Sequence, residues 1–193
     1  MIENYLLKLN QIFTEKKNVG SETSLYLWGD IDKKVMDKYH KPVDFDGVKE
    51  KETTPHTTLL YLPDVTGIEE DELYDIIKPI LKDVDADVFL DKYEVWEGVE
   101  NGESDVLVVR LKVPKSLENI REKIKDKIKE AGGKFIETYK GEWKAHATVA
   151  YFQRGKAPKD LKNLENTKYN IPEFKFQFGG RTAKRRSFSY FYK

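Results

Sequence analysis

HTTLLYL at residues 56–62 and HATVAYF at residues 146–152 follow one pattern: a histidine, a threonine two places later, then apolar and aromatic residues. The chain has only 3 histidines, and two of them lie in these matching contexts. Threonine, aliphatic and aromatic residues favour extended structure, so each stretch is predicted to be a β-strand. Because side chains alternate between the two faces of a strand, each histidine shares a face with its threonine.

The elements predicted around the two motifs occur twice in the same order. Hydrophobic periodicity predicts strands and helices that alternate as β-α-β-α-β, with a histidine strand third in each series. Two such units related by a pseudo-twofold axis would bring the histidine strands side by side. The first series is strand 24–28, helix 31–39, strand 56–62, helix 69–84 and strand 88–96; the second is strand 105–113, helix 116–131, strand 145–152, a short helix at 158–164 and strand 173–178.

Three local signals refine this pattern. Asn101-Gly102 predicts a tight hairpin between the strands on either side. Pro79 is expected to kink its helix or end it early. The polar, turn-rich residues 40–55 are predicted to form a loop, and their length makes them a candidate lid over a site.

Length and composition limit the class of protein. A chain of 193 residues suits one compact domain at 19–193, preceded by an amphipathic helix at 1–18. The 34 acidic and 34 basic residues balance, which argues against a strongly cationic nucleic-acid coat protein. The absence of cysteine removes disulfides, thiolate nucleophiles and cysteine-based zinc sites. The sequence shows no signal peptide or membrane span, so we expect a cytoplasmic protein.

If the two strands are neighbours, His56, Thr58, His146 and Thr148 converge on one site. One imidazole can take a proton from a water or a ribose 2′-hydroxyl, and the other can give a proton to the departing alkoxide. The threonine hydroxyls can donate to the phosphate oxygens, where charge accumulates in the transition state. The residues therefore predict phosphodiester cleavage without a metal or another cofactor.

Two other interpretations are open to these residues. A single His-x-Thr on a strand usually reflects packing, but two copies in matching positions argue against that role. A zinc site is the second alternative, although two histidines without a nearby carboxylate or cysteine leave the coordination incomplete. His40 has no matching threonine and is expected to be an exposed turn residue.

The paired motifs resemble the signature of the two-histidine (2H) phosphoesterases, the LigT-like superfamily. PHTTLLYL at 55–62 is similar to the first motif of that family, and HATVAYF to the second, especially in phage and bacterial members. The resemblance extends over roughly residues 22–192 and leaves the N-terminal helix unassigned. It implies an α/β (α+β) fold that is bilobal, with duplicated units and two antiparallel sheets around a central cleft. It also carries the catalytic roles over to the four His and Thr residues.

The substrate class implied by this resemblance is broad. Family substrates include 2′,3′-cyclic phosphate ends, 2′-5′ linkages and cyclic oligonucleotide signals, and one phage branch degrades the cyclic nucleotides of bacterial antiviral defence (anti-CBASS). Some members have an arginine shortly after the second motif, and Arg154 is the corresponding candidate here. The alternatives are a processing enzyme for 2′,3′-cyclic or 2′-5′ RNA ends and, in another class, a catalytically silent nucleotide- or RNA-binding module.

A nucleotide needs an aromatic surface on which its base can stack. Tyr26, Trp28, Trp96 and Trp143 are the candidates, because each lies on or beside a predicted strand. The basic run RTAKRR at 181–186 can hold a phosphate or a second nucleotide, or it can be a solvated hairpin end. We expect a nucleotide or short RNA-type partner and no membrane partner.

Overall fold

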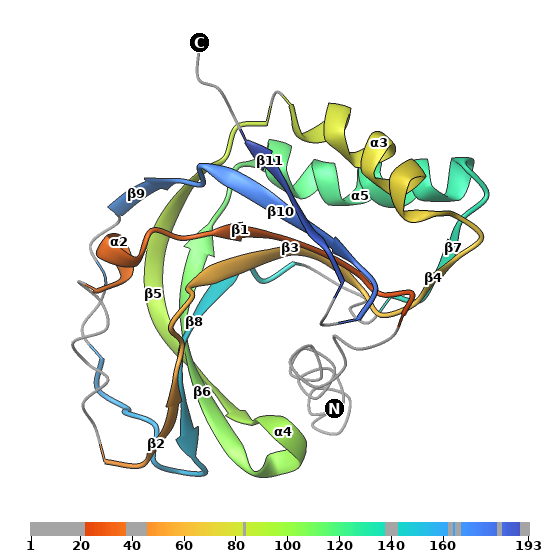
Figure 1. Ribbon diagram of the computed structural model, residues 1–193. Helices are drawn as coiled ribbons and strands as arrows, with labels where there is room; N and C mark the ends of the chain where they lie inside the picture. The colour runs from red at the N-terminus through yellow and green to blue at the C-terminus, as the bar shows by residue number, and fades with distance from the viewer. Residues whose placement is uncertain are drawn as a thin grey trace.

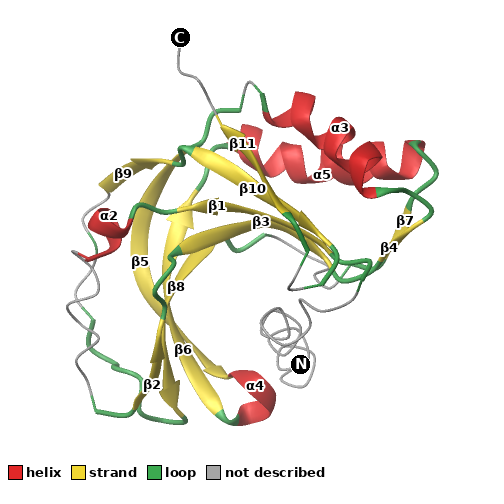
Figure 2. Ribbon diagram, in the orientation of Figure 1, coloured by secondary structure: helices red, strands yellow, loops and turns green. Residues whose placement is uncertain are grey.

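The computed structural model describes residues 22–37, 46–82, 84–137, 143–161, 164, 167–180 and 183–189. They form a mixed α+β fold of two antiparallel sheets with helices packed against them (Figures 1 and 2). The predicted N-terminal helix at 1–18 and His40 lie outside the described residues. The domain boundary at residue 19 therefore stays a prediction.

Sheet A contains the first histidine motif. Its strand order is β11-β10-β1-β3, and every neighbouring pair is antiparallel. The strand at 56–62 has the predicted bounds. The four strands are β1 (Leu25–Asp30), β3 (His56–Leu62), β10 (Glu173–Phe178) and β11 (Arg185–Ser189).

Sheet B contains the second motif and curves strongly along its length (Figure 1). Its order is β2-β8-β6-β5-β9, again antiparallel throughout. The five strands are β2 (Val48–Lys51), β5 (Asp87–Gly98), β6 (Ser104–Lys112), β8 (His146–Gln153) and β9 (Thr167–Asn170).

Two long helices, α3 (Glu70–Leu81) and α5 (Lys115–Glu130), pack against each other beside the sheets (Figure 2). Two short helices, α2 (Lys33–Asp37) and α4 (Val99–Gly102), lie in connections. A small sheet pairs β4 (Val65–Thr66) with β7 (Lys134–Phe135). No helix among the described residues is both long and apolar enough to cross a membrane.

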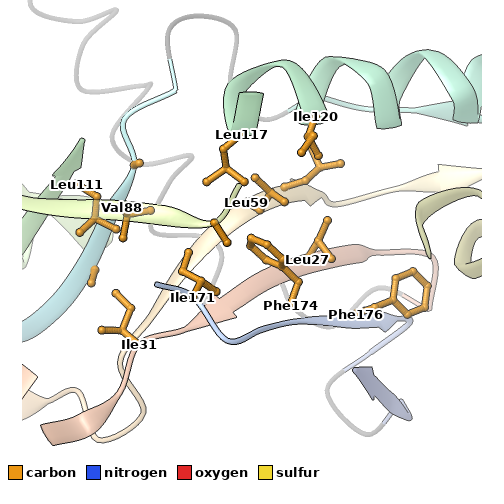
Figure 3. Close-up of a cluster of buried hydrophobic side chains, with 14 of the residues drawn as sticks. Leu27, Ile31, Leu59, Val88, Leu111, Leu117, Ile120, Ile171, Phe174 and Phe176 are labelled. Atoms are coloured by element: carbon orange, nitrogen blue, oxygen red, sulfur yellow. The ribbon is translucent and has the colours of Figure 1, made fainter. Parts of the chain in front are cut away.

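One continuous core joins both sheets and both long helices. Apolar side chains three or four residues apart on α3 and α5 reach it, as the helical period requires. Figure 3 shows how side chains from β1, β3, β10 and α5 converge. Complete burial of one such side chain stabilises the fold by about 1.5–3 kcal/mol. The fully buried members include Leu25, Leu27, Leu59, Leu73, Ile77, Leu117, Ile124, Phe174 and Phe176.

The two β-α-β-α-β series do not form two separate sheets. β5, the last strand of the first series, pairs with β6 in sheet B. β10, the last strand of the second series, pairs with β1 in sheet A. The short connection through α4 explains the first exchange, because it makes β5 and β6 neighbours in an antiparallel hairpin. The fold class with two antiparallel sheets is confirmed, whereas the duplication and the cleft stay predictions.

Several local predictions need correction. Residues 48–51, predicted as loop, form the edge strand β2, whose backbone pairs with β8 although its side chains are mostly exposed. Residues 158–161 and 164 are not helical. α3 continues past Pro79, which removes one backbone hydrogen bond, and ends at Leu81, three residues before the predicted end. The predicted tight hairpin turn is the helical turn α4, and β9 had not been predicted.

Candidate active site

The two histidine strands lie next to each other where sheet A meets sheet B. Two hydrogen bonds tie the regions together. Trp143 Nε1 donates to the backbone oxygen of Thr58 at 3.2 Å. The backbone nitrogen of Glu52, just before β3, donates to the oxygen of Val149 in β8 at 2.9 Å. The arrangement therefore brings both motifs to a single region of the molecule.

Each histidine shares a strand face with its threonine, as the alternation predicts. The residues between them, Thr57 and Ala147, are buried, whereas the histidines and threonines are partly exposed. We call the face of the two sheets that carries His56, Thr58, His146 and Thr148 the histidine face.

Both strands contain a β-bulge at the third residue after the histidine. On β3, Leu59 is the extra residue opposite β1. On β8, Val149 is the extra residue opposite β6. A bulge shifts the alternation by one place. As a result Tyr61 and Tyr151, each five residues after its histidine, come back to the histidine face.

The two imidazoles are held in the same way. His56 Nδ1 lies 2.8 Å from the backbone oxygen of Thr54, and His146 Nδ1 lies 2.8 Å from that of Lys144. A carbonyl oxygen can only accept, so each Nδ1 carries the hydrogen and donates it. Nε2 is therefore the nitrogen of each ring that can exchange a proton with a substrate.

A buried carboxylate fixes the segment that holds His56. Glu52 is 8% exposed. Its Oε1 accepts hydrogen bonds from the backbone nitrogen and the hydroxyl of Thr54, both at 3.1 Å. The carbonyl oxygen of the same Thr54 accepts the hydrogen bond from His56 Nδ1. Glu52 thus orients the ring of His56 through one intervening residue.

The neighbours of the two imidazoles carry opposite charge. Asp30 of β1 lies opposite His56 in the strand register, and it pairs with Lys175 and accepts from Trp28 Nε1. Arg110 of β6 lies opposite His146. The guanidinium of Arg110 is 3.2 Å from the carboxylate of Glu94.

The ring of His146 is shielded from water by a neighbouring indole. The ring of Trp96, which is 4% exposed, lies 4.4 Å from the His146 ring between centroids. Desolvation lowers the pKa of His146 to about 4, and the positive charges of Arg110 and His56 act in the same direction. The imidazole of His146 is consequently neutral at physiological pH.

Three of the four predicted aromatic residues surround the His and Thr side chains. The Tyr26 hydroxyl lies 3.1 Å from Thr58 Oγ1, and its ring stacks on Trp28 with centroids 4.6 Å apart. Trp28 is 6% exposed, so it supports the Tyr26 ring and offers little free surface for a base. Trp96 packs on His146, as described above. Trp143 instead packs against the core, with the guanidinium of Arg121 over its ring at 4.9 Å.

Arg154 lies at the opposite end of β8 from His146. Its Nη1 is 2.7 Å from Oδ1 of Asp105, a buried carboxylate that also accepts from the backbone nitrogens of Gly98 and Gly155. Arg154 thus stabilises the turn after β8 and does not lie near the histidines.

Sequence reasoning missed the residues on the strands that flank the motifs. Asp30, Glu94 and Arg110 follow from strand register, which includes the two bulges and cannot be inferred from periodicity. Glu52 lies four residues before His56 in a segment predicted to be a loop, and this proximity was the sequence feature that could have indicated it. Within the described part of the chain, no three His, Asp or Glu residues are grouped to hold a metal ion.

Comparison with known proteins places this fold. No protein-family profile matches the sequence. No curated protein matches it either. Among solved structures, a crystal structure of a phosphoesterase superposes with a TM-score of 0.59 at 14% identity, covering 88% of this chain and 95% of that one. E. coli LigT complexed with NADP+ superposes with a TM-score of 0.56 at 14% identity, covering 87% and 94%.

The chain has the LigT-like fold. A third structure, the MHV ns2 PDE domain, supports this conclusion with a TM-score of 0.54 at 18% identity, covering 78% of this chain and 89% of that one. The resemblance predicted from the two motifs is therefore confirmed as a LigT-like fold. Sequence identities this low show the fold and do not show the chemistry of the site.

Proposed function

We propose that the protein is a metal-independent phosphodiesterase that cleaves RNA-type or cyclic nucleotide bonds by two-histidine acid–base catalysis. The observation that carries the proposal is the correspondence between the motifs. Each supplies an imidazole with its Nδ1 bonded to a carbonyl and a threonine on the same face, followed by a bulge. A packing role requires none of these shared details. The solved complexes of LigT with NADP+, 3′-AMP and ATP support a nucleotide ligand.

The surroundings of the imidazoles assign their roles. His146 is neutral at pH 7, because desolvation, Arg110 and His56 disfavour its protonated form. It is therefore the general base, which takes a proton through Nε2 from a water or a ribose 2′-hydroxyl. The mechanism needs one base and one acid, so His56 is the general acid that supplies the second proton transfer.

In this mechanism the activated oxygen attacks phosphorus and the bond from phosphorus to the leaving oxygen breaks. His56 gives its Nε2 proton to the leaving oxygen, so His146 gains one proton and His56 loses one. Thr58 and Thr148 donate hydrogen bonds to the non-bridging oxygens as their charge increases. Acid–base catalysis of this kind contributes about 10²–10⁴-fold to the rate.

The proposal has a narrower form and two alternatives. The narrower form is an enzyme that degrades the cyclic oligonucleotide signals of antiviral defence, as in the phage branch of the family. Processing of 2′,3′-cyclic or 2′-5′ RNA ends uses the same four residues. A silent binding module would keep the fold without the catalytic residues, and the presence of both complete motifs favours an enzyme. We expect it to act in the cytoplasm.

The deciding experiment is incubation of the purified protein in EDTA with a panel of 2′,3′-cyclic nucleotides, 2′-5′ dinucleotides and cyclic di- and trinucleotides. Products are identified by mass spectrometry. We expect at least one member to be cleaved at an undiminished rate in EDTA, and both His56→Ala and His146→Ala to be inactive. Loss of activity in EDTA would contradict the metal-independent mechanism, and binding without cleavage would favour the silent module.

A further inference from the structure

The histidine face differs between the two sheets. On sheet B, Trp96, Val106, Val108 and Tyr151 form a separate buried cluster beside His146, and the charges of Arg110 and Glu94 there compensate each other. On sheet A the side chains beyond Thr58 are aromatic and polar, from Tyr26 and Trp28 outward to β10 and β11. An anionic part of a substrate that extends from the catalytic residues is therefore better accommodated along sheet A.

Arg185 of β11 is the residue on this side that can contact an anion. Its guanidinium lies over the ring of Trp28, with 5.7 Å between Cζ and the ring centroid. Its Nε donates to Oε1 of Gln177 at 3.3 Å. With Nε occupied, the two terminal nitrogens are left as a fork, the geometry that binds a phosphate through two parallel hydrogen bonds.

Arg185 is exposed, and among the described residues no carboxylate forms an ion pair with it. Lys175 of β10, a cation on the same face, already pairs with Asp30 and lies 3.6 Å from Glu173. The charge of Lys175 is therefore compensated, whereas that of Arg185 is available to a ligand.

The position of Arg185 suits a second phosphate. Trp28 lies opposite Thr58 on the neighbouring strand, and adjacent strands are about 5 Å apart. Arg185 lies on β11, three strand spacings or about 15 Å from β3, and its side chain extends back to the Trp28 ring. The guanidinium therefore lies beyond the phosphate under attack, at a position compatible with the next phosphate along a nucleotide chain.

We propose that Arg185, supported by Trp28 and Gln177, binds a second phosphate, so that the substrates are dinucleotides or longer molecules, linear or cyclic. This inference rests on the proposed function for the position of the first phosphate. It makes nucleoside 2′,3′-cyclic monophosphates poor substrates, because they have nothing to place at Arg185.

The adjacent residue, Arg186, is a matched control. It points to the other side of β11, where it lies 3.1 Å from Glu70 and 2.5 Å from Asp71 of α3. Arg185→Ala and Arg186→Ala therefore remove the same charge from the same strand on opposite faces. Melting temperatures of both variants show whether the fold is retained.

The test measures binding, so it does not depend on turnover. Calorimetry at low ionic strength gives the Kd of 3′-AMP and of the dinucleotide ApAp, which has a second phosphate, because exposed charge pairs are least screened there. We expect wild type and Arg186→Ala to bind ApAp about tenfold more tightly than 3′-AMP, as one charge-assisted contact provides. In Arg185→Ala that preference is expected to disappear, and Arg185→Lys should restore part of it.

Equal Kd values for the two ligands in wild type, no binding of ApAp, or the same loss in both arginine variants would overturn the subsite. The rates of cleavage of adenosine 2′,3′-cyclic phosphate and of ApA ending in a 2′,3′-cyclic phosphate are measured in parallel. If neither is cleaved but the binding preference depends on Arg185, the second-phosphate subsite stands and cleavage of these ends fails. If both are cleaved equally well and binding shows no preference for ApAp, the proposed cleavage stands and the second-phosphate subsite is wrong.

Discussion

β3 and β8 are built alike and surrounded differently. Both have a histidine, a threonine on the same face, a carbonyl acceptor for Nδ1 and a bulge at the same place. Yet His56 lies opposite Asp30, whereas His146 lies opposite Arg110 and under Trp96. The motif sets where the imidazoles point, and the residues around His146 lower the pKa of that imidazole.

The largest effects are expected from the histidines. His146→Ala and His56→Ala should each lower kcat by about 10²–10⁴-fold on a natural substrate. On uridine 3′-(p-nitrophenyl phosphate) the two variants should differ, because p-nitrophenolate leaves without a proton. His56→Ala should regain most of its activity there, whereas His146→Ala should stay inactive, since the 2′-hydroxyl still needs a base.

His40→Ala is the control for the loss of a histidine and should retain full activity. If both active-site variants recovered to the same extent on the activated ester, the assignment of base and acid would be wrong. Recovery of His146→Ala alone would reverse the roles.

The threonines should have the next largest effect. Thr58→Val and Thr148→Val remove a donor to the phosphate oxygens, and each should reduce kcat by about 10–10²-fold, at or below the lower end of the range for such donors. Thr58→Ser and Thr148→Ser keep the hydroxyl and should restore activity. Steady-state kinetics of the four variants tests this, and an effect on KM alone would contradict transition-state stabilisation.

Glu52→Gln tests the support behind His56. The amide can still accept from the backbone of Thr54 but has lost its charge, so we expect kcat to fall several-fold to about tenfold with KM unchanged. The limb of the pH profile that reports His146 should stay in place. Glu50→Gln, in the exposed edge strand of the same segment, is the control. An equal fall in both variants would contradict a specific positioning role for Glu52.

The smallest effect is a change in pH dependence. Protonation of His146 removes the base, so activity should fall on the acid side with a pKa near 4. Arg110→Met removes a positive charge that disfavours this protonation, so the acid limb should move upward by up to about one pH unit. Desolvation, the main cause of the low pKa, is retained. Arg110→Lys keeps the charge and should leave the limb in place, and a downward shift in Arg110→Met would contradict the electrostatic argument.

The sequence was most informative where local pattern alone decides structure. The bounds of β3 and α5 followed from turn residues and periodicity to within a residue. The strand face on which each His and Thr lies followed from the alternation of side chains along a β-strand. β2 was missed because an edge strand with exposed side chains has no apolar alternation to detect.

The rest depended on which strands become neighbours. Asp30 and Arg110 are far from their histidines in sequence and meet them only through the register of β1 with β3 and of β6 with β8. Each bulge shifts that register by one residue, and HTTLL and HATVA have no glycine or other local signal that marks it. The motif could therefore be predicted as a site, whereas its electrostatics could not.

β5 and β10 each pair with strands of the other half of the chain, and this affects how the protein folds. A chain cut in the α4 connection would give two fragments, each with one histidine strand and each lacking two strands of the sheet that holds it. Neither fragment can complete its hydrogen bonding alone, and sheet A closes only when β10 returns across more than a hundred residues to pair with β1. Such long-range pairing slows folding and couples the halves into one cooperative unit. The two imidazoles can therefore meet only after the whole chain has folded, and a half-folded protein lacks the complete candidate site.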